Sequence, residues 1–335
     1  MLSTSTTPLL GGRGPVARVA VMDLGTNTFH LLIAEPDSEN FFKEILHEHV
    51  GVKLGEGGIN EGTIKPDAYK RGMDTLVNFS QFIDQHQVTK VKAIATSAMR
   101  SASNGQQFIN EVKQRTGITI ETISGSMEAG YIYKGVKESG CLQQANSLII
   151  DIGGGSVEFI LGNQEQIIYK RSFEIGAARL MQKFHQTDPI TVDKVAELKL
   201  HLEDSLNPLF KAIQNQPIQN MIGSSGAFET FAELVELNKG NMFNLKQTKT
   251  YQFDKQELMD ITNMLIHSNH EERAFTKGII PVRVDMIVVA SLLTQYLVHQ
   301  LKINSVLMSS YSLKEGVLAD LLSPSPALPG REGAI

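Results

Sequence analysis

The chain has 335 residues, of which 41% are hydrophobic and 20% are charged. This balance excludes a largely disordered or fibrous chain, and the length predicts two domains rather than one. The formal charge of −5 excludes a general basic field for nucleic acid or an anionic membrane surface. The single cysteine, Cys141, excludes an internal disulfide, and we expect it to be a small buried apolar residue.

The two ends are predicted to be loose tails, at 1–15 and 323–335, because both are rich in Ser, Gly and Pro. No apolar run approaches the 18 or so residues of a membrane span, and the apolar kernel near the N-terminus lacks the length of a signal-peptide core. We therefore expect a soluble, cytoplasmic protein that has no membrane partner.

Strand and helix patterns alternate along the rest of the chain, which predicts an α/β fold. The expected strands are 16–22, 29–34, 90–95, 147–150 and 157–161. The expected helices are 65–85, 104–116, 127–137, 191–214 and 285–301, the last of them a core helix because it is apolar at helical spacing.

One short pattern occurs twice, at residues 19–33 and 148–161. In each copy an apolar strand ends in an aspartate (Asp23, Asp151), a glycine follows two residues later, and a small hydroxyl residue precedes a second apolar strand. This pattern predicts two β-hairpins with tight loops. The economical interpretation is two related domains, each of which presents one loop to a shared ligand cleft.

The run Gly153, Gly154 and Gly155 predicts an anion site, because consecutive unhindered amides can converge on phosphate oxygens. Asp151 beside a phosphate would be repulsive unless a divalent cation lay between them, so we expect Mg²⁺, or Mn²⁺, held by Asp151 and Asp23. The alternative is that both loops are merely tight hairpin turns.

Three further charged residues are candidates. Glu158 points away from its apolar strand neighbours and could orient or deprotonate a water. Glu128 falls in the first turn of a predicted helix, where it could instead serve only the helix dipole. Arg100 ends a predicted polar turn after a strand, where it could bind phosphate oxygens or make a surface ion pair. We interpret His267 and His270 as a loop or helix end rather than a zinc site, because no cysteine is near.

Seven segments together resemble the exopolyphosphatase and guanosine pentaphosphate phosphohydrolase family. They are 23–28 (DLGTNT), 96–100 (TSAMR), 124–129 (SGSMEA), 151–158 (DIGGGSVE), 176–179 (GAAR), 283–285 (RVD) and 310–316 (SYSLKEG). The resemblance implies two actin-like, ribonuclease H-like domains of the sugar-kinase, Hsp70 and actin superfamily with a cleft between them. We expect the first domain to comprise 16–137 plus 313–322, and the second 138–312.

The resemblance also implies an enzyme that removes the terminal phosphate of linear inorganic polyphosphate, or the 5′ γ-phosphate of guanosine pentaphosphate, with Mg²⁺. It places Glu128 and Glu158 at the catalytic acidic positions, Asp151 at the metal side and Arg100 at the phosphate-gripping arginine. The full set of expected phosphate-binding residues is Gly25, Thr26, Asn27, Thr28, Arg100, Gly153, Gly154, Gly155 and Ser156. The resemblance further suggests a homodimer.

We therefore predict an exopolyphosphatase in which Glu128, with Glu158, activates a water for in-line attack on phosphorus. The rival hypotheses are a guanosine pentaphosphate phosphohydrolase, a phosphotransferase and a non-catalytic sensor of polyphosphate or the alarmone. Three residues depart from the family pattern (Ser101, Ala227 and Lys314), and the helical C-terminal domain of longer members is not expected, which predicts a shorter polyphosphate channel.

Overall fold

The computed structural model describes residues 17–323, so the predicted tail 1–15 and residues 324–335 of the other lie outside the described residues. The first half of the described chain contains β1 (Val19–Leu24), β2 (Phe29–Pro36), β3 (Phe42–Val50), α1 (Pro66–Gln85), β4 (Lys90–Ala95), α2 (Ser97–Ser101), α3 (Gly105–Thr116), β5 (Ile120–Thr122) and α4 (Gly125–Ser139).

The second half begins with a similar succession of elements. It contains β6 (Ser147–Ile152), β7 (Val157–Gly162), β8 (Ile167–Phe173), α5 (Ala177–Phe184), α6 (Val192–Ile213), β9 (Asn220–Ser224), α7 (Gly226–Asn238), β10 (Thr250–Phe253), α8 (Lys255–His267), α9 (His270–Phe275), α10 (Met286–Gln300), β11 (Val306–Ser309) and α11 (Leu313–Leu322).

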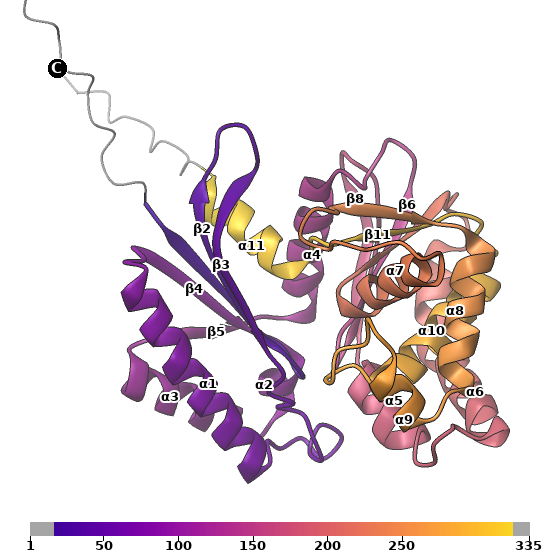
Figure 1. The fold of residues 1–335 in the computed structure, drawn as a ribbon, viewed down its shortest axis with the longest axis horizontal. Helices are drawn as coiled ribbons and strands as arrows, with labels where there is room; N and C mark the ends of the chain where they lie inside the picture. The colour runs from indigo at the N-terminus through magenta and orange to yellow at the C-terminus, as the bar shows by residue number, and fades with distance from the viewer. Residues whose placement is uncertain (1–16, 324–335) are drawn as a thin grey trace, which may run out of the picture.

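The two halves build two mixed sheets with the same strand order (Figure 1). The first sheet runs β3-β2-β1-β4-β5, and the second runs β8-β7-β6-β9-β11 with β10 added at the far edge. In both, the first three strands are antiparallel and the next two pair in parallel, while β10 pairs antiparallel with β11. The two hairpins predicted from the repeat are β1–β2 and β6–β7. The duplication seen in the sequence is therefore a duplication of the fold.

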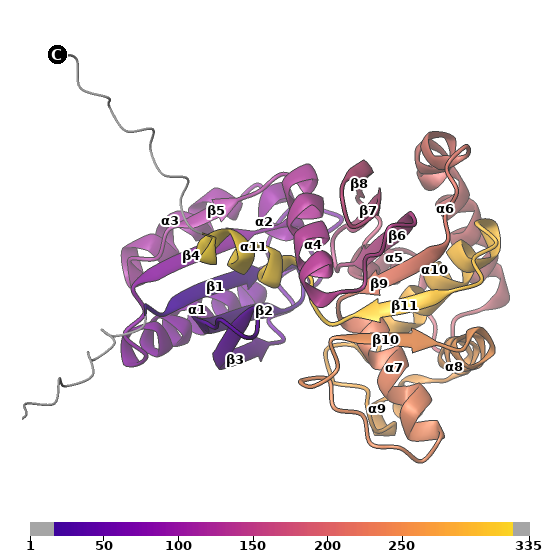
Figure 2. The same cartoon turned by 90° about the horizontal axis from the view of Figure 1, so that it is seen from above.

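Strand alternation divides the apolar side chains between two faces of each sheet. Ala20, Met22 and Leu24 of β1 pack in a core with α1 and α3, and the corresponding face of β6 packs in a larger core with α5, α6, α7 and α10. The opposite faces of both sheets share a third core with α4 and α11, which lie between the two lobes (Figure 2). Asp23 and Asp151 follow the alternation onto these facing sides.

Helices α4 and α11 meet with their backbones in close contact. A Cβ added at Gly135 would overlap the carbonyl oxygen of Ser312, and one added at Gly316 would overlap that of Tyr131. Helix α11 packs on β1 as well as on α4, while α4 also contacts β7 and β8. The assignment of residues 16–137 plus 313–322 to the first domain and 138–312 to the second stays a prediction.

Most predicted elements are present, with one local correction. The polar turn expected after β4 is wrong, because residues 97–101 form the short helix α2, in which the Arg100 N–H bonds to the Thr96 carbonyl. Cys141 is buried, and α10 is largely buried, as expected. Within residues 17–323, no helix combines the length and apolarity needed to cross a membrane.

Candidate active site

A cavity of about 180 Å³ lies where the β1–β2 and β6–β7 loops face each other. All of the predicted site residues line it except two, Arg100 and Glu158. It is also lined by groups that the sequence motifs did not single out for the site, among them His30, Thr96, Ser97, Ser225 and Ser312. The fold thus brings together residues from six separate parts of the chain.

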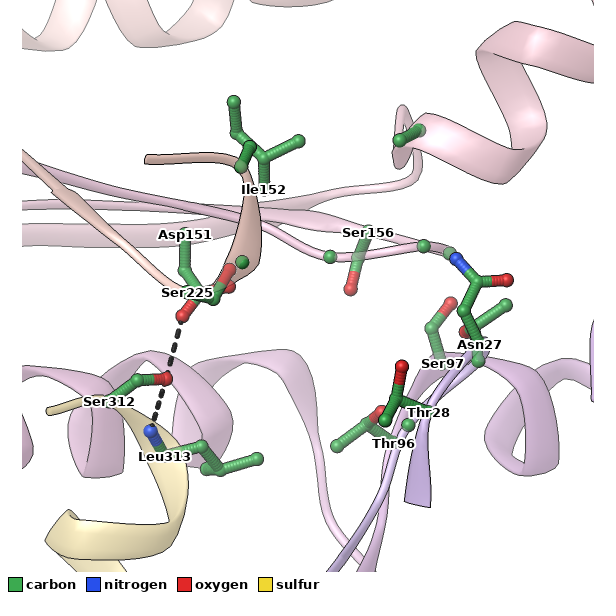
Figure 3. Close-up of a pocket in the computed structure, with 18 of the residues that line it drawn as sticks. Asn27, Thr28, Thr96, Ser97, Asp151, Ile152, Ser156, Ser225, Ser312 and Leu313 are labelled. Carbon is green, nitrogen blue, oxygen red and sulfur yellow. Dashed lines mark hydrogen bonds between the residues drawn. The ribbon is translucent and has the colours of Figure 1, made fainter. Parts of the chain in front are cut away.

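The two loops touch each other across this cavity. A Cβ added at Gly154 would overlap the side-chain amide of Asn27 and lie 3.0 Å from the Cβ of Thr26. The same amide of Asn27 donates to the sulfur of Met286 at the start of α10, at 2.8 Å. The hydroxyl-bearing residues Ser156, Thr28 and Thr96 gather nearby (Figure 3). Glycine at 154 is therefore needed for the approach of the first loop.

Asp151 is held rigidly at the end of β6. The hydroxyl of Ser224 donates to its Oδ2 at 2.7 Å. The hydroxyl of Ser312 donates to the same oxygen at 2.9 Å and also accepts from the Leu313 N–H at the start of α11 (Figure 3). Burial raises the pKa of Asp151, while these hydrogen bonds oppose the rise. Two neighbouring chain segments therefore fix one carboxylate oxygen.

Asp23 occupies the equivalent point of the first hairpin but has different neighbours. Burial raises its pKa to about 7, the charge of Lys314 opposes this, and Asp151 and Glu315 add to it. Lys314 pairs with Glu315 at 3.0 Å. The two aspartates therefore raise the cost of each other's charge, which is the condition that a bound cation relieves.

Glu128 lies in the first turn of α4, whose N-terminus is capped by the side chain of Ser124. It is 6% exposed and accepts a hydrogen bond from Arg100 at 3.0 Å. Burial raises the pKa of Glu128 to about 8, against the lowering effect of Arg100, and the charges of Asp23 and Asp151 add to the rise. The carboxyl group therefore reaches the cavity in a form that takes up a proton near neutral pH.

Glu158 lies beneath the cavity rather than in its wall. It is 1% exposed, accepts from the Ser172 hydroxyl at 2.6 Å, and lies on the same face of β7 as Ile160, as alternation predicts. Burial raises its pKa well above the ordinary range, and the charges of Glu128 and Asp151 contribute.

Arg179 and Glu174, to which the sequence analysis assigned no role, connect the two lobes. Arg179 on α5 donates to the carbonyl of Gly155 in the second loop and to the carbonyl of Ile59 in the first lobe, both at 2.8 Å. Glu174 accepts from Arg179 at 2.8 Å, from Arg100 at 3.3 Å and from Ser97 at 3.0 Å. The GAAR segment at 176–179 could have pointed to Arg179 as a site residue. The partners of Arg179 could not be read from it, because they come from distant parts of the chain.

Two places offer metal ligands. Asp23 and Asp151, with Glu128 and Glu158 close by, form a buried carboxylate group whose pKa values are all raised. Oxygen ligands of this kind fit Mg²⁺ or Mn²⁺.

The second place is formed by Asp188, His270 and Asp285, which bring one ligand atom each within 4.8 Å of one another. Arg273 donates to Asp188 there, at 2.8 Å, so part of this acidic group is already neutralised. His270 thus combines with two aspartates and not with His267, which ends α8.

Residues 32–324 match the Ppx/GppA phosphatase family. The chain belongs to this family. Its structure resembles that of an exopolyphosphatase from Cytophaga hutchinsonii, with 39% sequence identity and a TM-score of 0.88 over 91% of this chain and 97% of that one. The Aquifex aeolicus PPX-GPPA enzyme gives 25% identity and a TM-score of 0.75 over 91% and 100%.

Relatives by sequence lead to the same family. Exopolyphosphatase 2 of Mycobacterium tuberculosis is 24% identical over 318 residues, 91% of this chain and 99% of that protein. The bifunctional 3-dehydroquinate synthase/phosphatase of Fusobacterium nucleatum is 32% identical over 278 residues, which are 80% of this chain but only 41% of that protein. Membership makes this chain a phosphatase-family hydrolase, and the predicted actin-like fold is confirmed.

Proposed function

We propose that this member of the Ppx/GppA family is an exopolyphosphatase, which hydrolyses the terminal phosphate of linear inorganic polyphosphate. The observation that carries the proposal is the position of Glu128. Its buried carboxyl group enters a phosphate-sized cavity between two aspartate-ended hairpins. The names of the relatives from C. hutchinsonii and M. tuberculosis support the same substrate class.

The loops bind the terminal phosphate in this proposal. Backbone amides of the glycine loop and the side chains of Thr26 and Thr28 contact its oxygens, and Asp23 and Asp151 hold the divalent cation. When bound, the cation neutralises charge on the phosphate oxygens. Because Arg179 ties the glycine loop to Ile59 of the first lobe, the phosphate meets backbone donors of that loop whose positions are already fixed.

The water is activated by a carboxylate. Glu128 lines the cavity and Glu158 does not, so we assign the proton transfer from water to Glu128 and a supporting electrostatic role to Glu158. Arg100 pairs with Glu128 in the free protein. This pairing favours the ionised form of Glu128, and a cation held by Asp23 and Asp151 would offset the two charges that raise its pKa. The Glu128 carboxylate then accepts the proton as water attacks the terminal phosphorus in line with the oxygen of the departing shortened chain.

The test is phosphate release with Mg²⁺ from long polyphosphate, short polyphosphate, guanosine pentaphosphate and ATP. We expect release from polyphosphate, and Glu128→Gln should lower the rate about 10² to 10⁴-fold. The matched control is Glu165→Gln, which changes an exposed carboxylate in the turn before β8 and should leave the rate unchanged. A Glu128→Gln enzyme that keeps more than half of the wild-type rate would contradict the assignment.

The remaining outcomes separate the rival functions. Release from guanosine pentaphosphate alone would make the chain an alarmone phosphohydrolase. Phosphate transfer that requires an added acceptor would make it a phosphotransferase. Tight binding of polyphosphate without release from any of the four compounds would make it a sensor.

A further inference from the structure

Three histidines gather on one face of the first sheet, outside the carboxylate site. His47 and His49 are two residues apart on β3, so both side chains leave the strand on the same side. His30 on β2 is the direct pairing partner of His49 and therefore joins them on that side. His30 also pairs with Asp23 of β1 and lines the cavity. The face is the one that the second lobe covers.

Two of the three imidazoles, those of His30 and His47, share a hydrogen bond whose length is also the spacing that a metal ion requires. His30 Nδ1 lies 3.4 Å from His47 Nε2. Two nitrogens bound at 2.0 to 2.1 Å to one tetrahedral zinc ion are about 3.3 to 3.4 Å apart. The ring centroid of His49 is 6.0 Å from that of His30 and 6.4 Å from that of His47. The three rings do not yet bring one nitrogen each within 4.8 Å of one another, so binding requires the exposed His49 side chain to turn towards the other two.

A carboxylate behind His47 adds to this arrangement. Glu44 lies 3.8 Å from His47 Nδ1, on the side of the ring opposite the nitrogen that faces His30. At this distance Glu44 makes no hydrogen bond to the ring, but a small movement of its exposed side chain would let it accept one from Nδ1–H. Carboxylates bonded in this way fix the orientation of metal-binding histidines and raise their basicity. Glu44 is itself near Lys246 of the second lobe, at 3.7 Å.

We propose that His30, His47 and His49 form a binding site for one divalent transition-metal ion of the zinc class. Imidazole ligands select such ions, whereas the carboxylates of Asp23 and Asp151 suit Mg²⁺. The charges around the trio are mixed: Asp23 and Glu44 favour a cation, while Lys314 and Lys246 oppose it. The chain would thus hold two kinds of metal in adjacent places.

The consequence for hydrolysis rests on the proposed function. Because His30 is part of the cavity wall, an ion on the trio lies beside the place where the terminal phosphate binds. We expect zinc-class ions to inhibit Mg²⁺-dependent phosphate release. This effect is separate from binding itself, so a failure of the hydrolysis proposal leaves the binding measurement intact.

The test is the visible spectrum of the untagged full-length protein titrated with Co²⁺, which replaces zinc and absorbs strongly when its coordination is tetrahedral. We expect these bands to appear with one equivalent of Co²⁺ and to disappear on addition of Zn²⁺. His47→Ala should abolish them, and Glu44→Gln should weaken Co²⁺ binding about 10 to 100-fold. Both residues lie at the surface of β3, and far-ultraviolet circular dichroism checks that the variants fold.

Two control variants exclude other histidines. His299→Ala changes an exposed residue at the end of α10, and His270→Ala removes the imidazole of the Asp188, His270 and Asp285 group. Neither should alter the bands. Weak bands typical of six-coordinate Co²⁺, tetrahedral bands that survive His47→Ala, or bands lost in His270→Ala would each overturn the proposal.

Discussion

The two hairpin loops began as copies of one pattern, but they are not alike in what they contribute. The β1–β2 loop carries side chains at its tip, Thr26 and Asn27, whereas the β6–β7 loop carries Gly153 to Gly155. The reason is contact: the side chain of Asn27 occupies the space that a Cβ at Gly154 would need. A duplicated site facing itself must diverge, because two identical bulky loops could not meet across one cavity.

The strongest way to break this complementarity is Gly154→Ala. The added methyl group displaces Asn27, and a misplacement of this order typically costs about 10²-fold in rate. We expect kcat/KM for polyphosphate to fall by this factor. In the double variant Asn27→Ala with Gly154→Ala the overlap with the Asn27 amide is absent and only the 3.0 Å contact with the Thr26 Cβ remains, so its loss should be smaller than the product of the two single losses. Simple multiplication of the two losses would show that the loops do not depend on each other.

A smaller effect is expected for Arg179→Lys, which weakens the connection between the β6–β7 loop and the first lobe. An ammonium group cannot donate in several directions from one plane, so the contacts with Gly155, Ile59 and Glu174 cannot all be kept. We expect KM to rise about tenfold, equivalent to roughly 1.4 kcal/mol of binding, while kcat changes less.

The matched control is Arg115→Lys, which alters an exposed arginine paired with Glu111 on α3. Its kinetics should equal those of the wild type. An unchanged KM in Arg179→Lys would show that this arginine only stabilises its own lobe.

The smallest effect that we expect is on the pH dependence of stability, and it comes from the Glu128 carboxyl group in the cavity between the loops. Burial raises the pKa of Glu128 to about 8 from an ordinary 4.5, so between these values the folded protein holds a proton that the unfolded chain has lost. This contribution to stability is therefore present at low pH and is lost as pH rises towards 8. In buffer without Mg²⁺, we expect the wild-type melting temperature to fall by a few degrees more between pH 6 and pH 8 than that of Glu128→Gln. Parallel pH profiles for the two proteins would contradict the shifted pKa.

The sequence predicted those features that repeat or alternate locally. The Asp-x-Gly pattern located both hairpins, and alternation along β7 placed Glu158 on the face away from Val157 and Phe159. Long periodic helices were also found to within about two residues. The strands β3, β5, β8, β9, β10 and β11 and the helices α5, α7 and α8 were not predicted. For β9 and β11 the reason is length, because five and four residues give too short a pattern.

Contacts between distant segments could not be predicted in this way. Nothing local in Arg179 or Glu174 shows that they join two lobes, and nothing local places Asp188 beside Asp285. Likewise, the polar residues that end in Arg100 were predicted to form a turn after a strand. They form the short helix α2 instead, and Arg100 pairs with Glu128. These pairings are decided by how the two sheets face each other.

The glycine contact between α4 and α11 has a mechanical consequence. With backbones touching at Gly135 and Gly316, no flexible side chains lie between the helices to absorb a shift. The contact therefore resists sliding of one helix along the other, and it holds the two sheets that these helices cover at a fixed spacing.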